Sequence, residues 1–319
     1  MKVTVTGALG NLGQPVTEQL IRNGHQVRAF DLDTKASRKA ARRFGRDLEV
    51  VWGDLRRPDD VERAVAGQDT VIHLAFVLPK LSATGISSED EPLWAREINV
   101  GGTRNLLNVM RAQPRPPRIL FASSLHVYGR TQDQNPYRKV DDPLAPTDHY
   151  SHHKIICERL VRRSRLRWAI FRLGASMPTR LILDRGMFEV PLDTRIEFVH
   201  QRDVALAMAN ALDNEEVWGR IWNIGGGPSC QLTERELVQQ ILEAVGVGML
   251  PDDLFAARPY PVDWLDTRES QSALHFQYHT LQDYLHDVSR KLGFRRHLVR
   301  LCRPLIRAWL LRQAQAMRA

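Results

Sequence analysis

The stretch Thr6-Gly7-Ala8-Leu9-Gly10-Asn11-Leu12-Gly13 decides the fold of this chain. It follows an apolar run, Lys2 to Thr6, that is typical of a buried strand, and it precedes a helical pattern over Gln14 to Asn23. Its three glycines allow a tight turn, a close approach of a ligand to the backbone, and close packing of helix on strand. The start of the helix offers N–H groups and a positive dipole end to an anion. We therefore expect Gly7, Gly10, Asn11, Leu12 and Gly13 to hold a pyrophosphate.

An acidic residue ends the next expected strand, Gln26 to Asp31. Asp31 lies eighteen residues after Gly13, where a carboxylate can accept hydrogen bonds from both hydroxyls of an adenine ribose. This carboxylate favours NAD over NADP, although three basic residues, Lys35, Arg38 and Lys39, could soften its repulsion of a 2′-phosphate. The other interpretation of Asp31 is a solvated loop residue.

Short β-branched runs alternate with helical patterns over the first two hundred residues, as in βαβ units on a parallel sheet. Further strands are expected at Glu49–Trp52, Thr70–Leu74, Arg118–Ser123, Trp168–Leu173 and Arg220–Ile224. Further helices are expected at Asp59–Gly67, Ala95–Ala112, Ser151–Arg163 and Thr233–Val245, the last with a capping box of Thr233 and Glu236. Right-handed crossovers place helices on both faces, so the fold class is α/β, a Rossmann doubly wound parallel sheet.

The alternation fails after Leu173, where a loop-like stretch precedes a strand end and helix over Phe198 to Ala211. We expect residues 1–174 to form an NAD-binding Rossmann domain that is completed by about 196–225. Residues 175–195 and 226–294 would form a smaller, interleaved C-terminal substrate-binding region. Residues 295–319 would form a basic amphipathic tail.

The composition indicates in which cellular compartment the protein works and which kinds of partner it binds. The net charge is +8, but residues 290–319 hold nine Lys or Arg and no acid, which leaves −1 for the rest of the chain. A near-neutral body argues against nucleic acid. The N-terminus has no leader pattern and no run is long enough to span a membrane, so we expect a cytoplasmic protein. The three cysteines match no metal-ligand spacing, and no metal is expected.

With these residues in view, the chain resembles the extended short-chain dehydrogenase/reductase family, the NAD-dependent epimerases and dehydratases. The motifs are TGALGNLG at 6–13, Asp31, Gly53-Asp54-Leu55, His73-Leu74-Ala75, Asn99 in INVGGT, SSLHVYG at 123–129, Tyr150 with Lys154, FVHQRDVA at 198–205 and NIGGG at 223–227. The resemblance implies that Leu74 and Ala75 line the cofactor, that Asn99 supports the site from its helix, and that Asp54 and Leu55 lie beside the adenine. It also leaves open a homodimer through the helices of Asn99 and Tyr150.

The chemistry can be argued from the residues themselves. Tyr150 and Lys154 are spaced i and i+4, so on a helix both side chains point toward one site. The Lys154 ammonium would favour the phenolate of Tyr150 and lower its pKa from the usual value near 10. Ser124, at the end of a strand, could hold the substrate oxygen. We therefore expect these three residues to be catalytic, with Tyr150 as acid and base during hydride transfer at a carbinol or keto carbon.

Departures from the family pattern narrow the substrate. Leu125 and His126 stand where sugar dehydratases have an Asp-Glu pair, and Ala175 stands where nucleotide-sugar epimerases commonly have asparagine. The serine usual before the active-site lysine is His153. The segment from Ala175 to Phe198 is short, which predicts a small or open pocket, and the loop from Leu78 to Pro92 is a candidate lid. We interpret four histidines, 126, 152, 153 and 200, mainly as surface or packing residues, with His126 nearest the site.

The tail carries Arg296, Arg300, Arg303 and Arg307 on one helical face and Leu298, Leu301, Leu305 and Trp309 on the other, interrupted by Pro304. The favoured interpretation is that the apolar face packs on this or a partner subunit while the arginines are solvated. The alternative is a peripheral membrane contact with anionic lipid.

Three functions stay open. The leading one is an NAD-dependent oxidoreductase or epimerase acting on a small molecule. The second is a nucleotide-sugar epimerase, which Ala175 and the short segment disfavour. The third is a non-catalytic NAD(P)-binding redox sensor or assembly subunit, against which the intact Ser124, Tyr150 and Lys154 set argues.

Overall fold

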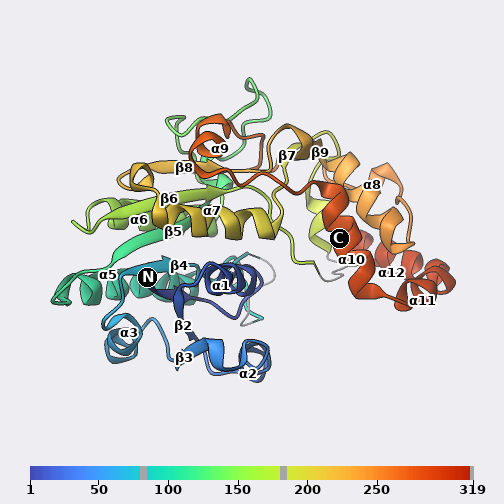
Figure 1. The fold of residues 1–319 in the computed structure, drawn as a ribbon. Helices are drawn as coiled ribbons and strands as arrows, with labels where there is room; N and C mark the ends of the chain where they lie inside the picture. Colours follow the sequence, from blue (N-terminus) through green and yellow to red (C-terminus); the bar gives the residue numbers. More distant parts are fainter. Residues whose placement is uncertain (80–84, 180–184, 317–319) are drawn as a thin grey trace.

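The fold is built on one parallel sheet, shown in Figure 1, a computed structural model that describes residues 1–79, 85–179 and 185–316. Seven strands lie in the order β3-β2-β1-β4-β5-β6-β8, and every neighbouring pair is parallel. The strands are β1 (Lys2–Thr6), β2 (Gln26–Asp31), β3 (Leu48–Trp52), β4 (Thr70–His73), β5 (Arg118–Ser124), β6 (Trp168–Leu173) and β8 (Ile221–Ile224). The order reverses at β1, whose neighbours are β2 and β4. A ligand crevice is expected at the carboxyl ends of the strands where such a reversal occurs.

Helices cover both faces because successive strand side chains point to opposite sides. Leu120 and Ala122 of β5 share one core with residues of α1 (Gly13–Arg22), α7 (Gln201–Asp213) and α9 (Arg268–Leu274). Ile119 and Phe121 point the other way, into a core with α3 (Pro58–Val65), α5 (Thr103–Ala112) and α6 (His149–Arg162). The predicted doubly wound Rossmann sheet is confirmed.

A third core lies in the C-terminal part of the chain. There β7 (Arg195–Glu197) pairs antiparallel with β9 (Gln231–Thr233), and the C-terminal helices gather beside one end of the sheet (Figure 1). These helices are α8 (Glu234–Val245), α10 (Leu281–Leu292), α11 (Arg295–Leu301) and α12 (Arg303–Ala316). The capping box of Thr233 and Glu236 begins α8 as predicted. Helices α9 and α10, and the short α2 (Lys35–Ala41), were not predicted.

One predicted helix is interrupted. The expected run from Ala95 to Ala112 consists of α4 (Pro92–Arg96), a π-helical segment Glu97–Gly102, and α5. A Cβ on Gly102 would lie 2.8 Å from the Cβ of Leu55, so the chain passes close to the loop after β3 at this point. A π-helical turn carries an extra residue and rotates its side chains, and here it contains Asn99.

The apolar face of the tail does not pack on this subunit, and packing on a partner subunit stays a prediction. Leu298, Leu301 and Leu305 are exposed by 52%, 79% and 73%. The buried tail residues are instead Leu310 and Ala314, in the third core. The candidate lid, the 175–195 segment and the tail include residues 80–84, 180–184 and 317–319, which lie outside the described residues.

Candidate active site

The glycine loop joins β1 to α1 with little free space. Gly7 has φ +70°, and a Cβ placed on it would lie 2.9 Å from the backbone N of Ala75. A Cβ on Gly13 would lie 2.0 Å from the carbonyl oxygen of Gly7, so helix and strand touch there. Gly10 is less confined, because its nearest atom would be at 3.3 Å. Gly7 and Gly13 are therefore required by packing alone, whereas Gly10 has another reason to be glycine.

The start of α1 has backbone N–H groups that are free to donate hydrogen bonds. Its N-cap residue, Leu12, makes no side-chain cap, and the first turn contains no acidic residue. The N–H of Gln14 donates to the carbonyl of Gly10 at 3.1 Å, while no acceptor is found among the described residues for the N–H groups of residues 11–13. Such N–H groups, together with the helix dipole, suit a phosphate.

Asp31 is tied to this loop. One carboxylate oxygen accepts the N–H of Leu9 at 2.9 Å, and the other accepts the N–H of Leu32 at 2.8 Å. Burial raises the pKa of Asp31, and these two backbone hydrogen bonds oppose that rise. Of the three cations that could favour a 2′-phosphate, Arg38 is already engaged with Asp33, at 2.5 Å.

The other two adenine-side candidates are engaged in the protein itself. The Asp54 carboxylate accepts hydrogen bonds from the backbone N–H and the guanidinium of Arg56. Burial of Asp54 would raise its pKa, but these bonds bring it below its usual range. The Leu55 side chain is buried in the core against Gly102. The position of Asp54 and Leu55 just after β3 is therefore the one feature that suggests contact with a ligand.

The end of β4 lies against the glycine loop. The N–H groups of Leu74 and Ala75 both donate to the hydroxyl of Thr6 at 3.2 Å. Fully buried Asn99 holds Val77, two residues further along. The Asn99 side chain accepts the N–H of Val77 at 2.7 Å and donates to the carbonyl of Val77 at 3.1 Å. Asn99 is thus a support for the chain after β4.

Ser124, Tyr150 and Lys154 come together at the carboxyl end of β5. Ser124 ends β5, and its side chain is hydrogen-bonded to that of Tyr150. Tyr150 and Lys154 lie one turn apart on α6, whose N-cap Asp148 forms a capping box with Ser151. All three are buried or nearly so, with exposures of 7%, 9% and 3%. The predicted grouping of these side chains is what the structure shows, although their roles stay predictions.

The expected effect of Lys154 on Tyr150 is absent from this structure. Burial raises the pKa of Tyr150 to about 12, the hydrogen bond from Ser124 lowers it, and the charge of Asp148 raises it. The ammonium of Lys154 donates to the carbonyl of Ala122 at 2.6 Å, and among the described residues it makes no hydrogen bond to the phenol. Tyr150 therefore holds its proton at neutral pH in this form.

Lys154 occupies an aromatic site. Its Nζ lies 3.5 Å from the ring centroid of Phe76 and 4.9 Å from that of Phe121. Burial lowers its pKa to about 7, and Glu158 and Cys157 partly oppose this. The edge of Phe76 also meets Tyr150, at 5.8 Å between centroids. Phe76 thus links the two residues, and no sequence motif distinguishes it.

Other residues around Tyr150 were missed or left undecided. Glu89 accepts the N–H groups of His149 and Tyr150 at 3.1 and 3.0 Å, so its carboxylate lies at the start of α6. His126 packs edge-on against Tyr150 and Tyr260, with both centroid distances at 5.7 Å, and its Nδ1 is 3.5 Å from Asp148. The Asp148–Ser151 spacing is a capping signal that the sequence did contain.

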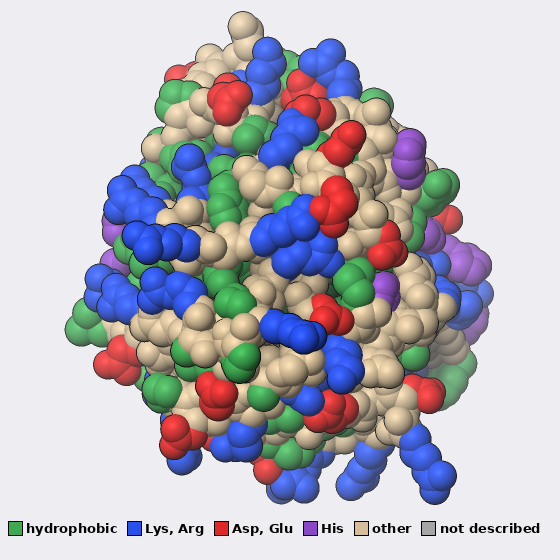
Figure 2. Space-filling model, turned by 60° about the vertical axis from the view of Figure 1, so that its left-hand side comes forward, with side chains coloured by type: hydrophobic (Ala, Val, Ile, Leu, Met, Phe, Trp, Pro, Cys, Tyr) green, Lys and Arg blue, Asp and Glu red, His purple; other side chains and the backbone are tan. Residues whose placement is uncertain are grey.

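The remaining candidates have structural surroundings. The hydroxyl of Tyr128 donates to Asn223 at 2.7 Å and accepts from Arg172 at 3.0 Å, deep in the core. His153 is buried beside Asn99, and His200 stacks on His279 at 4.8 Å. Within the described ranges, no group of three potential metal ligands occurs, and no helix is long and apolar enough to cross a bilayer. Figure 2 shows basic and acidic side chains interspersed over one face of the molecule.

A dinucleotide fits the protein's own geometry. The glycine loop admits no side chain at position 13, the first N–H groups of α1 face no protein acceptor among the described residues, and Asp31 lies beside them. Lys154 and Tyr150 lie on α6, which follows β5, and β4 alone separates β5 from β1, where the strand order reverses. This is the place at which a sheet of this topology binds a nucleotide.

Three kinds of comparison agree with that geometry. The model of the NAD dependent epimerase/dehydratase family matches residues 3–176, more than half of the chain. Among curated proteins, an uncharacterized protein y4nG of Sinorhizobium fredii is 27% identical over 261 residues, which cover 76% of this chain and 60% of that protein. UDP-glucose 4-epimerase of Pisum sativum is 32% identical over 50% of this chain and 47% of its own length.

A 3 beta-hydroxysteroid dehydrogenase/Delta 5-->4-isomerase of Mycobacterium tuberculosis is 31% identical over 50% of this chain and 42% of its own length. The matches therefore span only 42% to 60% of the length of these curated relatives. Among solved structures, UDP-glucose 4-epimerase of Thermus thermophilus with NAD has a TM-score of 0.74 at 22% identity, covering 92% of this chain and 99% of that one. UDP-glucuronic acid 4-epimerase of Bacillus cereus has a TM-score of 0.75 at 18% identity, covering 92% and 100%. These structures share the fold.

Proposed function

Because the chain belongs to the NAD-dependent epimerase/dehydratase family, we propose that it is an NAD-dependent oxidoreductase or epimerase that acts at a carbinol or keto carbon of a small molecule. The observation that carries the proposal is the shared burial of three side chains where α6 meets the end of β5: Ser124 is the last residue of β5, and Tyr150 and Lys154 lie one helical turn apart on α6. Relatives named as dehydrogenases and as epimerases match at similar identity, which supports both halves of this statement.

The residues would share the work as follows. Gly7, Gly10 and Gly13 with the start of α1 would hold the pyrophosphate, and Asp31 would hold the adenine ribose. The cofactor, when bound, supplies the hydride acceptor or donor. Lys154 would donate hydrogen bonds to the nicotinamide ribose, and Ser124 would hold the substrate oxygen beside Tyr150.

Tyr150 moves the proton. In this structure its pKa is about 12, so it is a proton donor at neutral pH. It therefore suits protonation of the oxygen of a ketone as hydride reaches the carbon. In the reverse direction the phenolate must take the carbinol proton, and for that the pKa must fall, as it would if Lys154 left the carbonyl of Ala122 and turned its charge toward the phenol.

A sugar-nucleotide substrate is the second candidate, because sugar-nucleotide epimerases stand among the relatives. Ala175, where such enzymes commonly have asparagine, is joined by a backbone bridge to Phe198, and its carbonyl accepts the N–H of Val199 at 2.9 Å. Its methyl group offers no hydrogen bond to a ligand. This weakens the candidate without changing the proposed chemistry.

The first test is to release and identify any nucleotide from the purified chain by mass spectrometry. Retained NAD supports an epimerase-like cycle, in which the cofactor is not exchanged. An empty protein that takes up added NADH supports an exchanging dehydrogenase or reductase. Failure to bind either nucleotide contradicts the proposal.

The second test is the substitution Tyr150→Phe. It should lower kcat by about 10²- to 10⁴-fold, because it removes a positioned acid and base. The affinity for NAD, measured by calorimetry, should not change. The control is Tyr137→Phe, at a tyrosine that is 47% exposed. Activity would be followed as NADH absorbance with secondary alcohols and ketones, and as interconversion of UDP-glucose and UDP-galactose. Full activity in Tyr150→Phe would remove the proposed mechanism.

A further inference from the structure

The tail presents an apolar stripe to solvent. Five side chains spaced by three or four residues along α11 and α12 are exposed by 46% to 79%, and we call them the tail stripe: Phe294, Leu298, Leu301, Leu305 and Trp309. This spacing places them along one side of a nearly continuous helix, since the N–H of Cys302 donates to the carbonyl of Leu298 and that of Ile306 to the carbonyl of Cys302. Such a contiguous exposed row indicates an interaction surface.

The arginine face of the tail explains why the stripe points outward. The guanidinium of Arg307 donates to the carbonyls of Val247, Gly248 and Met249 at 3.1, 3.0 and 2.7 Å. Arg300 lies against Gly246, the left-handed C-cap of α8, and would be 2.6 Å from a Cβ placed there. Arg307 therefore binds the chain just after α8, and the aliphatic part of the Arg300 side chain lies against the C-cap glycine. The orientation of the tail is thus fixed by the protein itself, and the stripe is left uncovered by the described residues.

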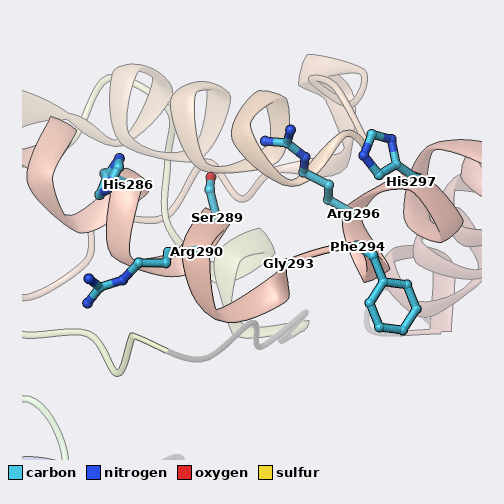
Figure 3. Close-up of a pocket in the computed structure, with 7 residues that line it drawn as sticks. All are labelled: His286, Ser289, Arg290, Gly293, Phe294, Arg296 and His297. Atoms are coloured by element: carbon cyan, nitrogen blue, oxygen red, sulfur yellow. The ribbon is translucent and has the colours of Figure 1, made fainter.

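A basic hollow adjoins the start of the stripe. A pocket of about 450 Å³ between α10 and α11 is lined by His286, Ser289, Arg290, Gly293, Phe294, Arg296 and His297, with no acidic residue among them (Figure 3). In Figure 3 the guanidinium of Arg296 extends back toward Ser289, while the ring of Phe294 points away to the other side. Apolar and cationic groups therefore stand next to each other here.

The charge within the tail itself is of one sign. Residues 290–319 contain nine Lys or Arg and no Asp or Glu. Within the described chain, no ion pair is formed by Arg295, Arg296, Arg300, Arg303 or Arg312, and these five are exposed. A second copy of this surface would bring these cations face to face, which is unfavourable. The surface that complements it is both apolar and anionic.

We propose that the tail stripe rests in the interface of a membrane that contains anionic lipid. Phe294, Leu298, Leu301, Leu305 and Trp309 would lie at the level of the acyl chains, with the neighbouring arginines at the phosphates and the hollow around Arg296 receiving a headgroup. Trp309 suits this depth because tryptophan favours the boundary between water and lipid. The proposal is independent of the substrate and of the catalytic residues.

The test is sedimentation of the full chain with vesicles of equal parts phosphatidylglycerol and phosphatidylcholine, and with vesicles of phosphatidylcholine alone. The chain should pellet only with the first kind, and added salt should release it. Leu301→Glu and Leu305→Glu should each weaken binding by about tenfold or more. Arg295→Gln and Arg296→Gln should each weaken it about fivefold.

Matched controls carry the same changes elsewhere. Leu93→Glu alters a leucine that is 80% exposed on α4, and Arg111→Gln alters an exposed arginine on α5; neither should affect binding. Equal pelleting with both vesicles, no pelleting, or an equal effect of Leu93→Glu would overturn the proposal. So would a dimer, seen by light scattering, that Leu301→Glu dissociates.

A second measurement does not depend on how the variants fold. Cys302 is exposed within the tail, while the other two cysteines, Cys157 and Cys230, are buried. A polarity-sensitive dye attached to Cys302 should report a less polar environment when the phosphatidylglycerol vesicles are added. Pelleting without this change would mean that another surface binds the lipid, which contradicts the proposal.

Discussion

Lys154 shows how much one residue's behaviour depends on its neighbours. Its spacing from Tyr150 is a property of the helix, but the position of its ammonium is set by the ring of Phe76 at 3.5 Å and the carbonyl of Ala122 at 2.6 Å. Because it is nearly fully buried, its ammonium form has lost water, and its pKa falls from 10.5 to about 7. The stability of the fold should therefore depend on pH even without a cofactor.

Between pH 7 and 10.5 the unfolded chain binds a proton at Lys154 that the folded chain does not bind. The free energy of unfolding therefore rises with pH in that window, by up to about 1.4 kcal/mol per pH unit for this one group. Urea unfolding of the wild type and of Lys154→Met should be measured from pH 7 to 10. Over this range the free energy of unfolding of the wild type should rise relative to that of the variant. The control is Lys35→Met, at an exposed position of α2. A constant difference between wild type and Lys154→Met would mean that the folded lysine keeps its charge.

At the scale of single residues, sequence reasoning predicted that Ser124, Tyr150 and Lys154 lie together, as they do in the structure, and misjudged the pKa of Tyr150. The i, i+4 rule is enough to place Tyr150 and Lys154 on one face of α6. The pKa argument failed because it assumed that the ammonium faces the phenol. Phe76 and Glu89 come from loops with no periodic pattern, and only the folded chain brings them to Tyr150. Tyr260 reaches the site through its ring contact with His126.

Among the elements, the strand–loop–helix unit at the N-terminus has the strictest geometry. Gly13 lies against the carbonyl of Gly7, while Gly10 touches it more loosely, at 2.0 and 3.3 Å from an added Cβ. The two positions should therefore respond differently to the same substitution, since a Cβ at Gly13 would overlap backbone atoms, whereas a Cβ at Gly10 would make a tight contact with one carbonyl oxygen.

Gly13→Ala should lower the free energy of unfolding by about 1–3 kcal/mol and abolish NAD binding, because backbone atoms must move. Gly10→Ala should leave stability nearly unchanged and weaken NAD binding alone. Gly101→Ala is the control, since no atom lies within 4 Å of an added Cβ there and its φ is not positive. Thermal unfolding and calorimetric titration with NAD would separate the two effects. Equal losses at positions 10 and 13 would contradict this account of the loop.

Elements with a clear local sequence signal were predicted well. Elements that depend on contacts between distant parts of the chain were not. The glycine loop and the capped start of α8 carry local signals that the structure reproduces. The π-helical segment around Asn99 has no such signal, because it arises where Gly102 meets Leu55 and Asn99 turns to Val77. The tail had the right period, but the contact of Arg307 with the chain after α8 was missed, since the acceptors of its hydrogen bonds lie far away in the sequence.

For the molecule as a whole, a buried ion pair joins parts of the chain that no local rule connects. Arg172 of β6 donates to Glu158 of α6 at 2.8 and 3.0 Å, to the hydroxyl of Tyr128, and to the carbonyl of Val140. Burial lowers the pKa of Arg172, but the bonds to Glu158 outweigh it and raise the pKa. Both side chains are at most 4% exposed, so leaving either charge without its partner would strongly lower the free energy of unfolding.

Arg172→Met should lower the free energy of unfolding by about 3–5 kcal/mol, because it strands the Glu158 carboxylate. Adding Glu158→Met should restore a large part of that loss. The surface pair Arg22 and Glu18 is 65% and 61% exposed, and Arg22→Met should cost less than about 1 kcal/mol. Urea unfolding at neutral pH measures all three. A double variant as unstable as Arg172→Met would show that the pair stabilises the fold in some other way.

The strand order has a consequence for how the protein is made. The last strand of the sheet, β8, pairs with β6, yet residues 174–220 separate the two in the chain. A ribosome delivers β6 first, so the nascent chain carries an unpaired sheet edge until translation has passed Ile224. Such an edge invites pairing with a neighbouring nascent chain. A gene truncated after Leu173 should thus yield inclusion bodies, and slow codons between the two strands should lower the yield of the full protein.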